Sequence, residues 1–408
     1  KFLMNNIEKI IRNCQICKKK LVRLFSLGRH PLCDDLIKIN KKKKNLTYPI
    51  ELIYCKNCSI VYQKYQIKHK VLFPKEYHYR GRLTKDVVDG QERLVNSIIK
   101  KYGNLKNKTV LDIGCNDGTL LNFFKKKGAI TYGIEPTDAA KEANPGHVII
   151  NNFFNYKNIK LIKKKFKNID YITFTNVFAH INNLNDTLKS LKQIISKNTK
   201  IIIENHYLGS VIDKKQIDTF YHEHPRTYSL KSLSIIAKKL NLNLEYFEFP
   251  KRYGGNVRVF MGTSYSSQNL KKIFKNEKLF YKRLKIIHKK IKLWKEKKIK
   301  QFDYLNKIHG PLPAKAYPGR AAILIKLLGL NNSHISATFE KVNSKKIGNY
   351  IPGTKIPIVS DKNLRKKIGI KVPIINLAWH IPKEIQKYLR VQNVKNKIIN
   401  IIDKNDFI

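Results

Sequence analysis

The 408-residue sequence predicts an α/β protein built from more than one domain. A chain of this length exceeds the size at which one hydrophobic core keeps growing, so we expect two or three domains. From about residue 79 to 262, apolar runs alternate with amphipathic helices, and this pattern is typical of a parallel, doubly wound sheet. Two Cys-x-x-Cys pairs precede this region and indicate a small metal-binding unit near the N-terminus.

The N-terminal cysteines are paired as Cys14 with Cys17 and Cys55 with Cys58. Each pair places two thiolates on one tight turn, so together they predict a closed, tetrahedral, structural zinc site with no position for water. Four unrelated thiols are the alternative, which the paired spacing disfavours, although the insert is longer than that of a usual zinc ribbon. We expect the remaining Cys33 to be a small buried residue and not a fifth ligand.

Four buried strands are predicted in the central region. The first, over residues 109–113, runs into a turn over 114–118 and then into a helix. In a doubly wound sheet the ligand lies at the carboxyl ends of the strands, so we expect the functional site at that edge. The other predicted strands cover residues 129–135, 171–175 and 200–204.

The C-terminal third is predicted to form a second, smaller α/β domain. Residues 269–307 carry apolar side chains at helical spacing, and they predict long amphipathic helices in which Trp294 packs. Strand and helix units follow over 321–328, 334–339 and 372–379. We therefore divide the chain into domains of residues 1–75, 76–265 and 266–408.

The chain is strongly basic, with 82 Lys and Arg against 29 Asp and Glu and a net charge of +53. A nucleic-acid-binding protein would gather this charge into patches with aromatic residues and would use much arginine. Here lysine is scattered from end to end and arginine is sparse. This favours a composition bias on the surface, and we expect no nucleic-acid partner.

Nothing in the sequence predicts export or membrane insertion. No run of about eighteen apolar residues occurs, and the first residues lack the apolar core of a signal peptide. The Cys-x-x-Cys pairs suit thiolate ligands in a reducing compartment better than disulfides. We therefore expect a cytoplasmic protein.

The turn after the first central strand has the composition of a cofactor-binding loop. Glycines there let the backbone approach a ligand, while the dinucleotide pattern and the P-loop pattern are both absent. The second strand ends on Glu135, whose carboxylate can accept two ribose hydroxyls. This arrangement resembles the S-adenosylmethionine (SAM) site of Rossmann-like methyltransferases, with Asn116 in place of the expected middle glycine. The expected cofactor-binding residues are Asp112, Gly114, Asn116, Asp117, Gly118, Glu135 and Asn176.

The run Tyr221-His222-Glu223-His224 packs four groups able to exchange protons into one short segment. From the residues alone, it is either an acid–base site or a metal site in which His222 and His224 are ligands. The metal interpretation lacks a convincing third ligand and is disfavoured.

The chain as a whole resembles the SAM-dependent sugar C-methyltransferases, which methylate a carbon of a nucleotide-linked deoxy-keto-hexose. The resemblance extends over almost the whole chain, and its segments occur in the same order. It implies a zinc-binding N-terminal domain, a central Rossmann-like SAM methyltransferase domain and a C-terminal α/β domain that helps to hold a nucleotide-linked keto-sugar. The segments are the paired cysteines and residues 110–118, 176–181, 218–224, 254–259, 348–354 and 377–380.

The resemblance also implies roles for individual residues. A sugar carbon next to a ketone is a weak acid, so a base must remove its proton while donors stabilise the enolate. We expect His224 to be the base, Tyr221 to relay a proton or contact the enolate, and Glu223 to orient them. The other catalytic candidates are His180 at the same sheet edge, His222, and Tyr77 and Tyr79, between which the choice is open.

The sequence departs from the family in the C-terminal domain, where the Ala-Lys-Gly element appears only loosely at residues 313–317. Lys315 and Arg258 are candidates for neutralising a pyrophosphate. The alternative, which has equal weight, is that they belong to a solvated, positively charged surface. Two other functions are considered: a zinc-ribbon-containing RNA methyltransferase, and a non-catalytic protein that binds zinc and SAM.

Overall fold

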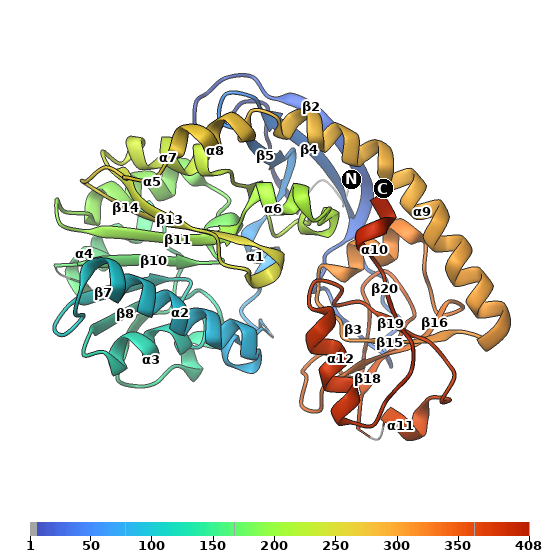
Figure 1. The fold of residues 1–408 in the computed structure, drawn as a ribbon. Helices are drawn as coiled ribbons and strands as arrows, with labels where there is room; N and C mark the ends of the chain where they lie inside the picture. Colours follow the sequence, from blue (N-terminus) through green and yellow to red (C-terminus); the bar gives the residue numbers. More distant parts are fainter. Residues whose placement is uncertain (1–5, 78, 167, 363, 408) are drawn as a thin grey trace.

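The computed structural model describes residues 6–77, 79–166, 168–362 and 364–407. Two α/β bodies, each built on its own sheet, stand at the left and right of Figure 1. N-terminal strands and one long helix connect the two bodies across the top of the same view. The predicted α/β class with a separate N-terminal unit is confirmed.

The N-terminal unit is a four-stranded antiparallel sheet in the order β12-β5-β4-β2. Strand β12 is contributed by a later part of the chain, directly after the Tyr-His-Glu-His run, and pairs with β5. The N-terminal unit therefore holds the segment that carries the predicted base. The elements of this unit are β1 (Ile7–Ile10), β2 (Val22–Pro31), β3 (Ile37–Lys38), β4 (Thr47–Cys55), β5 (Ile60–Gln63), β6 (Tyr65–Ile67), α1 (His69–Leu72) and β12 (Arg226–Thr227).

The central sheet has seven strands in the order β13-β14-β11-β10-β7-β8-β9. Its five central and edge strands from β11 to β9 are parallel, as predicted, while β14 runs antiparallel to both β11 and β13. The antiparallel pair is a difference from the purely parallel sheet expected. The strands are β7 (Thr109–Ile113), β8 (Ile130–Ile134), β9 (Val148–Ile150), β10 (Tyr171–Thr175), β11 (Lys200–His206), β13 (Asn243–Glu248) and β14 (Asn256–Gly262).

Helices cover both faces of this sheet because successive strand residues point to opposite sides. Val110 and Ile202 pack against Leu94 and Phe124 on one face, while their neighbours on the strands pack against helices on the other. The helices are α2 (Lys85–Tyr102) and α3 (Thr119–Lys126) on the first face, and α4 (Ile159–Lys165), α5 (Leu184–Ile194) and α7 (Leu230–Lys239) on the second.

The predicted linking helices are α8 (Leu270–Glu277) and α9 (Phe280–His309). The buried side chains of α9 recur every three or four residues, which gives the helix one apolar face. Trp294 is fully buried on that face, as predicted. This face packs into a core shared by the N-terminal strands, the short helix α6 (Leu208–Asp213) and the C-terminal domain.

The C-terminal domain is a five-stranded parallel sheet in the order β18-β16-β15-β19-β20. This confirms the second, smaller α/β domain. A short strand β17 leaves the domain to pair with β3 of the N-terminal unit. The elements are β15 (Leu312–Lys315), α10 (Ala321–Leu328), β16 (Ile335–Glu340), β17 (Asn349–Tyr350), β18 (Ile358–Ser360), α11 (Leu364–Lys367), β19 (Ile374–Asn376), α12 (Pro382–Val391) and β20 (Ile398–Asn400).

The domain boundaries at residues 75 and 265 stay predictions. Within the described ranges, every helix is too short or too polar to cross a membrane.

Candidate active site and zinc site

The four paired cysteines converge on one point in the N-terminal unit. Their sulfur atoms all lie within 4.8 Å of one another. The Sγ atoms of Cys14 and Cys58 are 3.9 Å apart, and those of Cys17 and Cys55 are 3.5 Å apart. Zinc–sulfur bonds in a tetrahedral site place the sulfurs about 3.8 Å from each other. The donor set therefore fits a closed four-thiolate zinc site.

The backbone shapes each cysteine pair into a knuckle. The N–H of Cys17 points to the Sγ of Cys14 at 3.5 Å, and the N–H of Cys58 points to the Sγ of Cys55 at 3.4 Å. Hydrogen bonds from Cys55 and Cys58 also lower the pKa of the Cys14 thiol. Cys33 is buried elsewhere, in the core shared with the C-terminal domain, as the sequence predicts.

The loop after β7 requires backbone conformations that suit glycine. Gly114 has φ +76°, and a Cβ atom there would lie 2.5 Å from the Val177 side chain. Gly118 has φ +73°. Asn116 has φ +50°, and asparagine is among the few other residues that adopt this left-handed region readily. The replacement of the expected middle glycine by Asn116 is therefore compatible with the loop.

Glu135 follows β8 and lies directly beside this loop. Its carboxylate accepts the N–H of Asn116 at 3.0 Å and the N–H of Thr137 at 2.9 Å, so its position is fixed. Asp112, on β7, accepts the Thr173 hydroxyl at 2.7 Å inside the sheet, and burial raises its pKa to about 7. The residues fit a SAM molecule in which Glu135 would hold the ribose, with Asp112 supporting the loop from below.

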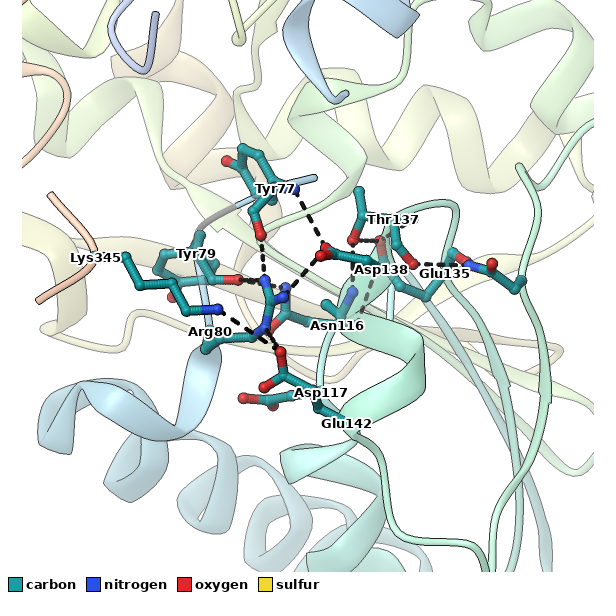
Figure 2. Close-up of polar contacts among 12 residues, drawn as sticks. Tyr77, Tyr79, Arg80, Asn116, Asp117, Glu135, Thr137, Asp138, Glu142 and Lys345 are labelled. Atoms are coloured by element: carbon teal, nitrogen blue, oxygen red, sulfur yellow. Dashed lines mark hydrogen bonds and ion pairs between the residues drawn. The ribbon is translucent and has the colours of Figure 1, made fainter. Parts of the chain in front are cut away.

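A segment formed by Tyr77 and residues 79–82, here called the strap, lies against the cofactor loop of residues 114–118 (Figure 2). The N–H of Gly81 donates to the Asn116 side chain at 2.9 Å, and that side chain donates to the Tyr79 carbonyl at 3.2 Å. The N–H of Arg82 donates to Asp117 at 3.1 Å. Asn116 and Asp117 therefore hold the segment that leads from the N-terminal unit into α2.

Arg80 fixes this strap from inside. Its buried guanidinium lies 2.8 Å from Glu142 and 3.1 Å from Asp138, and it also donates to the carbonyls of Tyr77 and Tyr79 (Figure 2). The C-terminal domain reaches the same carboxylate, with the Nζ of Lys345 3.8 Å from Glu142. Sequence reasoning missed Arg80. The sequence does carry a signal for it, because position 80 is an arginine in a chain where lysine is the usual cation.

The predicted base lies in a cluster of rings at the carboxyl edge of the central sheet. The ring of His224 is 4.9 Å from that of His180, 5.2 Å from that of His206 and 4.3 Å from that of Tyr221. His180 follows β10, and His206 ends the neighbouring parallel strand β11. The sheet therefore brings His180 and His224 together, and it adds His206, which sequence reasoning missed.

Backbone carbonyls set the tautomers of two imidazoles. The Nδ1 of His224 lies 2.9 Å from the Thr219 carbonyl, and the Nδ1 of His180 lies 2.7 Å from the Glu223 carbonyl. A carbonyl oxygen only accepts, so Nδ1 carries the proton in both rings and Nε2 holds a lone pair. Burial, with smaller effects of His180 and His206, lowers the pKa of His224 well below its usual value, so the ring is neutral near pH 7.

Glu223 and Tyr77 line a cavity of about 270 Å³ whose other lining residues, such as Asp34 and Tyr48, belong to the N-terminal part of the chain. Burial, and then the nearby Asp34, raises the pKa of Glu223 well above its usual value, which favours the protonated form. Tyr77 lines this cavity and burial raises the pKa of its phenol well above the usual value, whereas Tyr79 is 39% exposed and contacts the cofactor loop through its carbonyl. Of the two tyrosines, Tyr77 therefore faces the cavity.

His222 is directed away from the ring cluster. Its Nε2 lies 3.1 Å from the carbonyl of Tyr48 in β4, so it joins the catalytic segment to the N-terminal unit. A metal site built on His222 and His224 also finds no support, because the thiolate cluster is the one group of three or more metal-ligating side chains in the part of the chain that the structure describes.

Family comparisons cover the chain in three consecutive pieces. Residues 14–73 match "Putative zinc binding domain", residues 85–246 match "Methyltransferase domain", and residues 251–402 match "C-methyltransferase C-terminal domain". The chain is also similar to the C-methyltransferase NovU of Streptomyces niveus, with 23% identity over 394 residues that cover 94% of this chain and 93% of that protein. The chain belongs to the C-methyltransferase family.

Two further similarities are partial. An uncharacterized RNA methyltransferase of Clostridium acetobutylicum is 35% identical over 66 residues, which cover 16% of this chain and 14% of that protein. Among solved structures, the magnesium protoporphyrin IX methyltransferase of Synechocystis PCC 6803 with bound SAH has a TM-score of 0.34 and 15% identity over 44% of this chain and 84% of that chain.

This C-methyltransferase is a SAM-dependent enzyme with a structural zinc site. Two cations considered for its substrate are instead paired inside the protein. Arg258, on β14, lies 2.7 Å from Glu204, and Lys315, at the end of β15, lies 2.5 Å from Asp361. All four side chains are buried, so neither cation is available to neutralise a pyrophosphate. Asn176 points its side-chain oxygen to Asn256 at 3.1 Å, beside the same buried network.

In this C-methyltransferase the C-terminal domain touches the catalytic segment through a residue that sequence reasoning missed. Arg320, just before α10, places its Nε 2.8 Å from Asp218, which lies three residues before Tyr221. From this domain the sequence offered Lys315, in the loosely matched Ala-Lys-Gly element, as a candidate for neutralising a pyrophosphate. Arg320 lies five positions later, in the turn that enters the helix.

Proposed function

We propose that the enzyme methylates a carbon of a nucleotide-linked keto-deoxysugar after His224 removes a proton from the carbon next to the carbonyl. One observation carries the proposal. The Nε2 lone pair of His224 is kept available by the Thr219 carbonyl, inside a buried ring cluster at the sheet edge that also holds the cofactor loop. A neutral, oriented imidazole is the form of histidine that accepts a proton.

The proton passes from the sugar carbon to Nε2 of His224, and the electrons of that C–H bond move toward the carbonyl oxygen. The phenol of Tyr221 and the protonated carboxyl of Glu223 are hydrogen-bond donors suited to the resulting enolate. Bound SAM supplies an electrophilic methyl group, and its sulfur keeps the electron pair of the S–CH₃ bond when the enolate carbon takes that methyl. The protein's own part is to position the base and to stabilise negative charge on oxygen.

A second cavity supports a nucleotide-linked substrate. It has a volume of about 600 Å³ and lies where β16 and β18 end in the C-terminal domain. Tyr388 offers an aromatic ring there, and one Asp361 oxygen is buried without a hydrogen-bond partner among the described residues. Cations suited to phosphate groups surround it, namely Lys341, Lys362, Arg365 and Lys366.

The proposal is tested by incubating the enzyme with SAM and a panel of nucleotide-linked 4-keto-sugars, and by measuring the product mass. We expect one sugar to gain a methyl group. His224→Gln should bind SAM as the unchanged enzyme does, because His224 lies outside the cofactor loop, and should lose turnover by a factor of about 100 or more. His222→Gln is the matched control and should keep most of its turnover.

Full turnover by His224→Gln would refute the assignment of the base. SAM binding without transfer to any sugar of the panel would favour a non-catalytic protein or a different class of substrate. Methyl transfer to RNA in a parallel incubation would favour the RNA methyltransferase alternative.

A further inference from the structure

One carboxylate in the catalytic segment is held entirely by the C-terminal domain. Asp218 accepts hydrogen bonds from the Nε of Arg320 at 2.8 Å, from the Nη2 of Arg320 at 3.1 Å and from the indole N–H of Trp379 at 2.9 Å. Arg320 precedes α10 and Trp379 follows β19, so two separate parts of that domain converge on this group. Asp218 is 1% exposed, and Arg320 is 8% exposed.

The turn that carries Asp218 also orients the base. Asp218 lies in a single helical turn over Ile217–Thr219, and the carbonyl of Thr219 accepts the Nδ1–H of His224. The start of this turn is held as well, because the side-chain oxygen of Gln216 accepts from Arg320 at 3.1 Å and the N–H of Thr219 donates to the Gln216 carbonyl at 3.0 Å. Arg320 therefore holds the turn through the side chains of both Gln216 and Asp218.

We propose that Asp218 is a positioning residue, held by Arg320 and Trp379, which sets the orientation and tautomer of the His224 imidazole through the Thr219 carbonyl. In this proposal, His224 is correctly oriented to act as a base only when the C-terminal domain is docked against the turn that carries Asp218. The inference rests on the proposed function, in which His224 is the base. It does not require knowledge of which sugar is methylated.

The charges around His224 give this arrangement an electrostatic consequence. The groups facing its ring are His180 after β10, His206 on β11, Tyr221 in its own segment and the Arg320 guanidinium from the C-terminal domain. The Arg320 cation opposes protonation of the ring, and the Asp218 carboxylate offsets part of that cation's field. Arg320→Gln should therefore raise the pKa of His224 toward its ordinary value, and Asp218→Asn should lower it further.

The test uses the full-length zinc-loaded protein with isotope-labelled histidine, and it reads the tautomer and pKa of each ring from nitrogen chemical shifts. The His224 signals are assigned by their loss in His224→Gln. In the unchanged protein we expect the Nδ1–H tautomer. In Asp218→Asn and Trp379→Phe we expect a mixture with the Nε2–H tautomer, because the turn then loses at least one of the three hydrogen bonds that hold it.

Turnover is measured on the keto-sugar that the unchanged enzyme methylates. We expect Asp218→Asn and Arg320→Gln each to lose about tenfold or more in kcat with SAM affinity unchanged, and Arg320→Lys, which keeps the positive charge, to retain more turnover than Arg320→Gln. Arg390→Gln, at an exposed arginine of the same domain that lies outside the proposed nucleotide cavity, is the control and should leave both turnover and the His224 tautomer unchanged.

The proposal is overturned if Asp218→Asn or, should that variant not fold, Trp379→Phe and Arg320→Gln keep the pure Nδ1–H tautomer with the pKa of His224 unchanged. The tautomer is read without substrate, so this failure is distinct from failure of the proposed function. A normal tautomer shift in an enzyme that methylates no sugar would overturn the proposed function and leave the positioning of His224 intact.

Discussion

His30 and His222 are buried imidazoles whose charged forms the fold disfavours. Each donates a hydrogen bond from Nε2 to a backbone carbonyl, and both are at most 3% exposed. Burial lowers the pKa of His30 to about 4 and that of His222 to about 3, in each case against the raising effect of that hydrogen bond. Both rings belong to the contact between the N-terminal unit and the catalytic segment.

These depressed pKa values predict acid sensitivity in a defined range. Above a pH of about 6.5 both rings are neutral whether the chain is folded or unfolded, so they do not affect stability. Below this pH the two rings take up protons in the unfolded chain but stay neutral in the folded chain, so the free energy of unfolding falls. By pH 5 the loss is about 2 kcal/mol for each ring. Thermal unfolding followed between pH 8 and pH 5 measures this loss of stability.

The matched variants are His222→Gln, which should flatten the pH dependence, and His309→Gln near the end of α9, which should leave it as it is. A melting temperature independent of pH over this range would contradict the burial of neutral rings at the contact.

Several residue-level features of the site follow from the sequence, and others do not. The base, the glycine turn and Glu135 have the residue types that their chemistry requires, so they are recognisable without coordinates. The side-chain directions of His222 and His224 cannot be recognised in this way. The two residues are two positions apart in an irregular segment, and this spacing does not fix how their side chains lie relative to each other. Arg320 was missed because its partner Asp218 lies 102 positions away in the chain.

At the scale of elements, each zinc knuckle is a short turn whose backbone N–H groups already point to sulfur. Lys18 and Ser59, which directly follow the two pairs, have φ values of 65° and 54°. These conformations are uncommon for residues other than glycine, and they persist where the surroundings over-determine them. A zinc ion held by the four thiolates would tie both turns together.

Cys14→Ser should therefore abolish zinc binding and destabilise the N-terminal unit, because three thiolates leave the tetrahedral site open. The measurement is zinc content by metal analysis together with the melting temperature. Cys33→Ser is the control, since Cys33 lies outside the cluster, and it should keep its zinc even if its loss from the core costs stability. Unchanged zinc in Cys14→Ser would contradict the assignment of the four ligands.

Strands β7, β8, β10 and β11 of the central sheet and β16 and β19 of the C-terminal sheet lie in predicted segments, because each is a short apolar run bounded by turn residues. Strands β9, β15, β18 and β20 were not predicted. The antiparallel strand β14 is buried at every position, so its sequence gives no alternation to distinguish its direction. Strand β12 has two residues and exists only by pairing with β5, a contact between distant parts of the chain. Local patterns do not predict such a strand.

At the scale of the whole molecule, the positive charge lies mainly on the surface. Two of the buried acids are matched by buried cations: Glu204 with Arg258, and Asp361 with Lys315. The remaining lysines are largely exposed and produce a field that attracts anions, which suits a substrate carrying phosphate groups. This field does not select one anion over another, so specificity requires local contacts, which we propose the two cavities provide.

One core joins the three parts of the chain. Side chains of β2 and β4, the apolar face of α9, and strands and helices of the C-terminal domain pack together, and α6 reaches the same cluster beside the catalytic segment. The contacts of His222 and Asp218 with the flanking units extend this assembly to the base. The catalytic segment is therefore held from both sides and not by the central sheet alone.

The central claim is that His224 removes a proton from the carbon next to a sugar carbonyl. The most direct measurement is deuterium uptake from D₂O into a nucleotide-linked 4-keto-sugar that the enzyme methylates, with S-adenosylhomocysteine in place of SAM so that no methyl is transferred. The account predicts enzyme-dependent uptake at that carbon, and only background exchange with His224→Gln. Uptake by His224→Gln at the rate of the unchanged enzyme would contradict it.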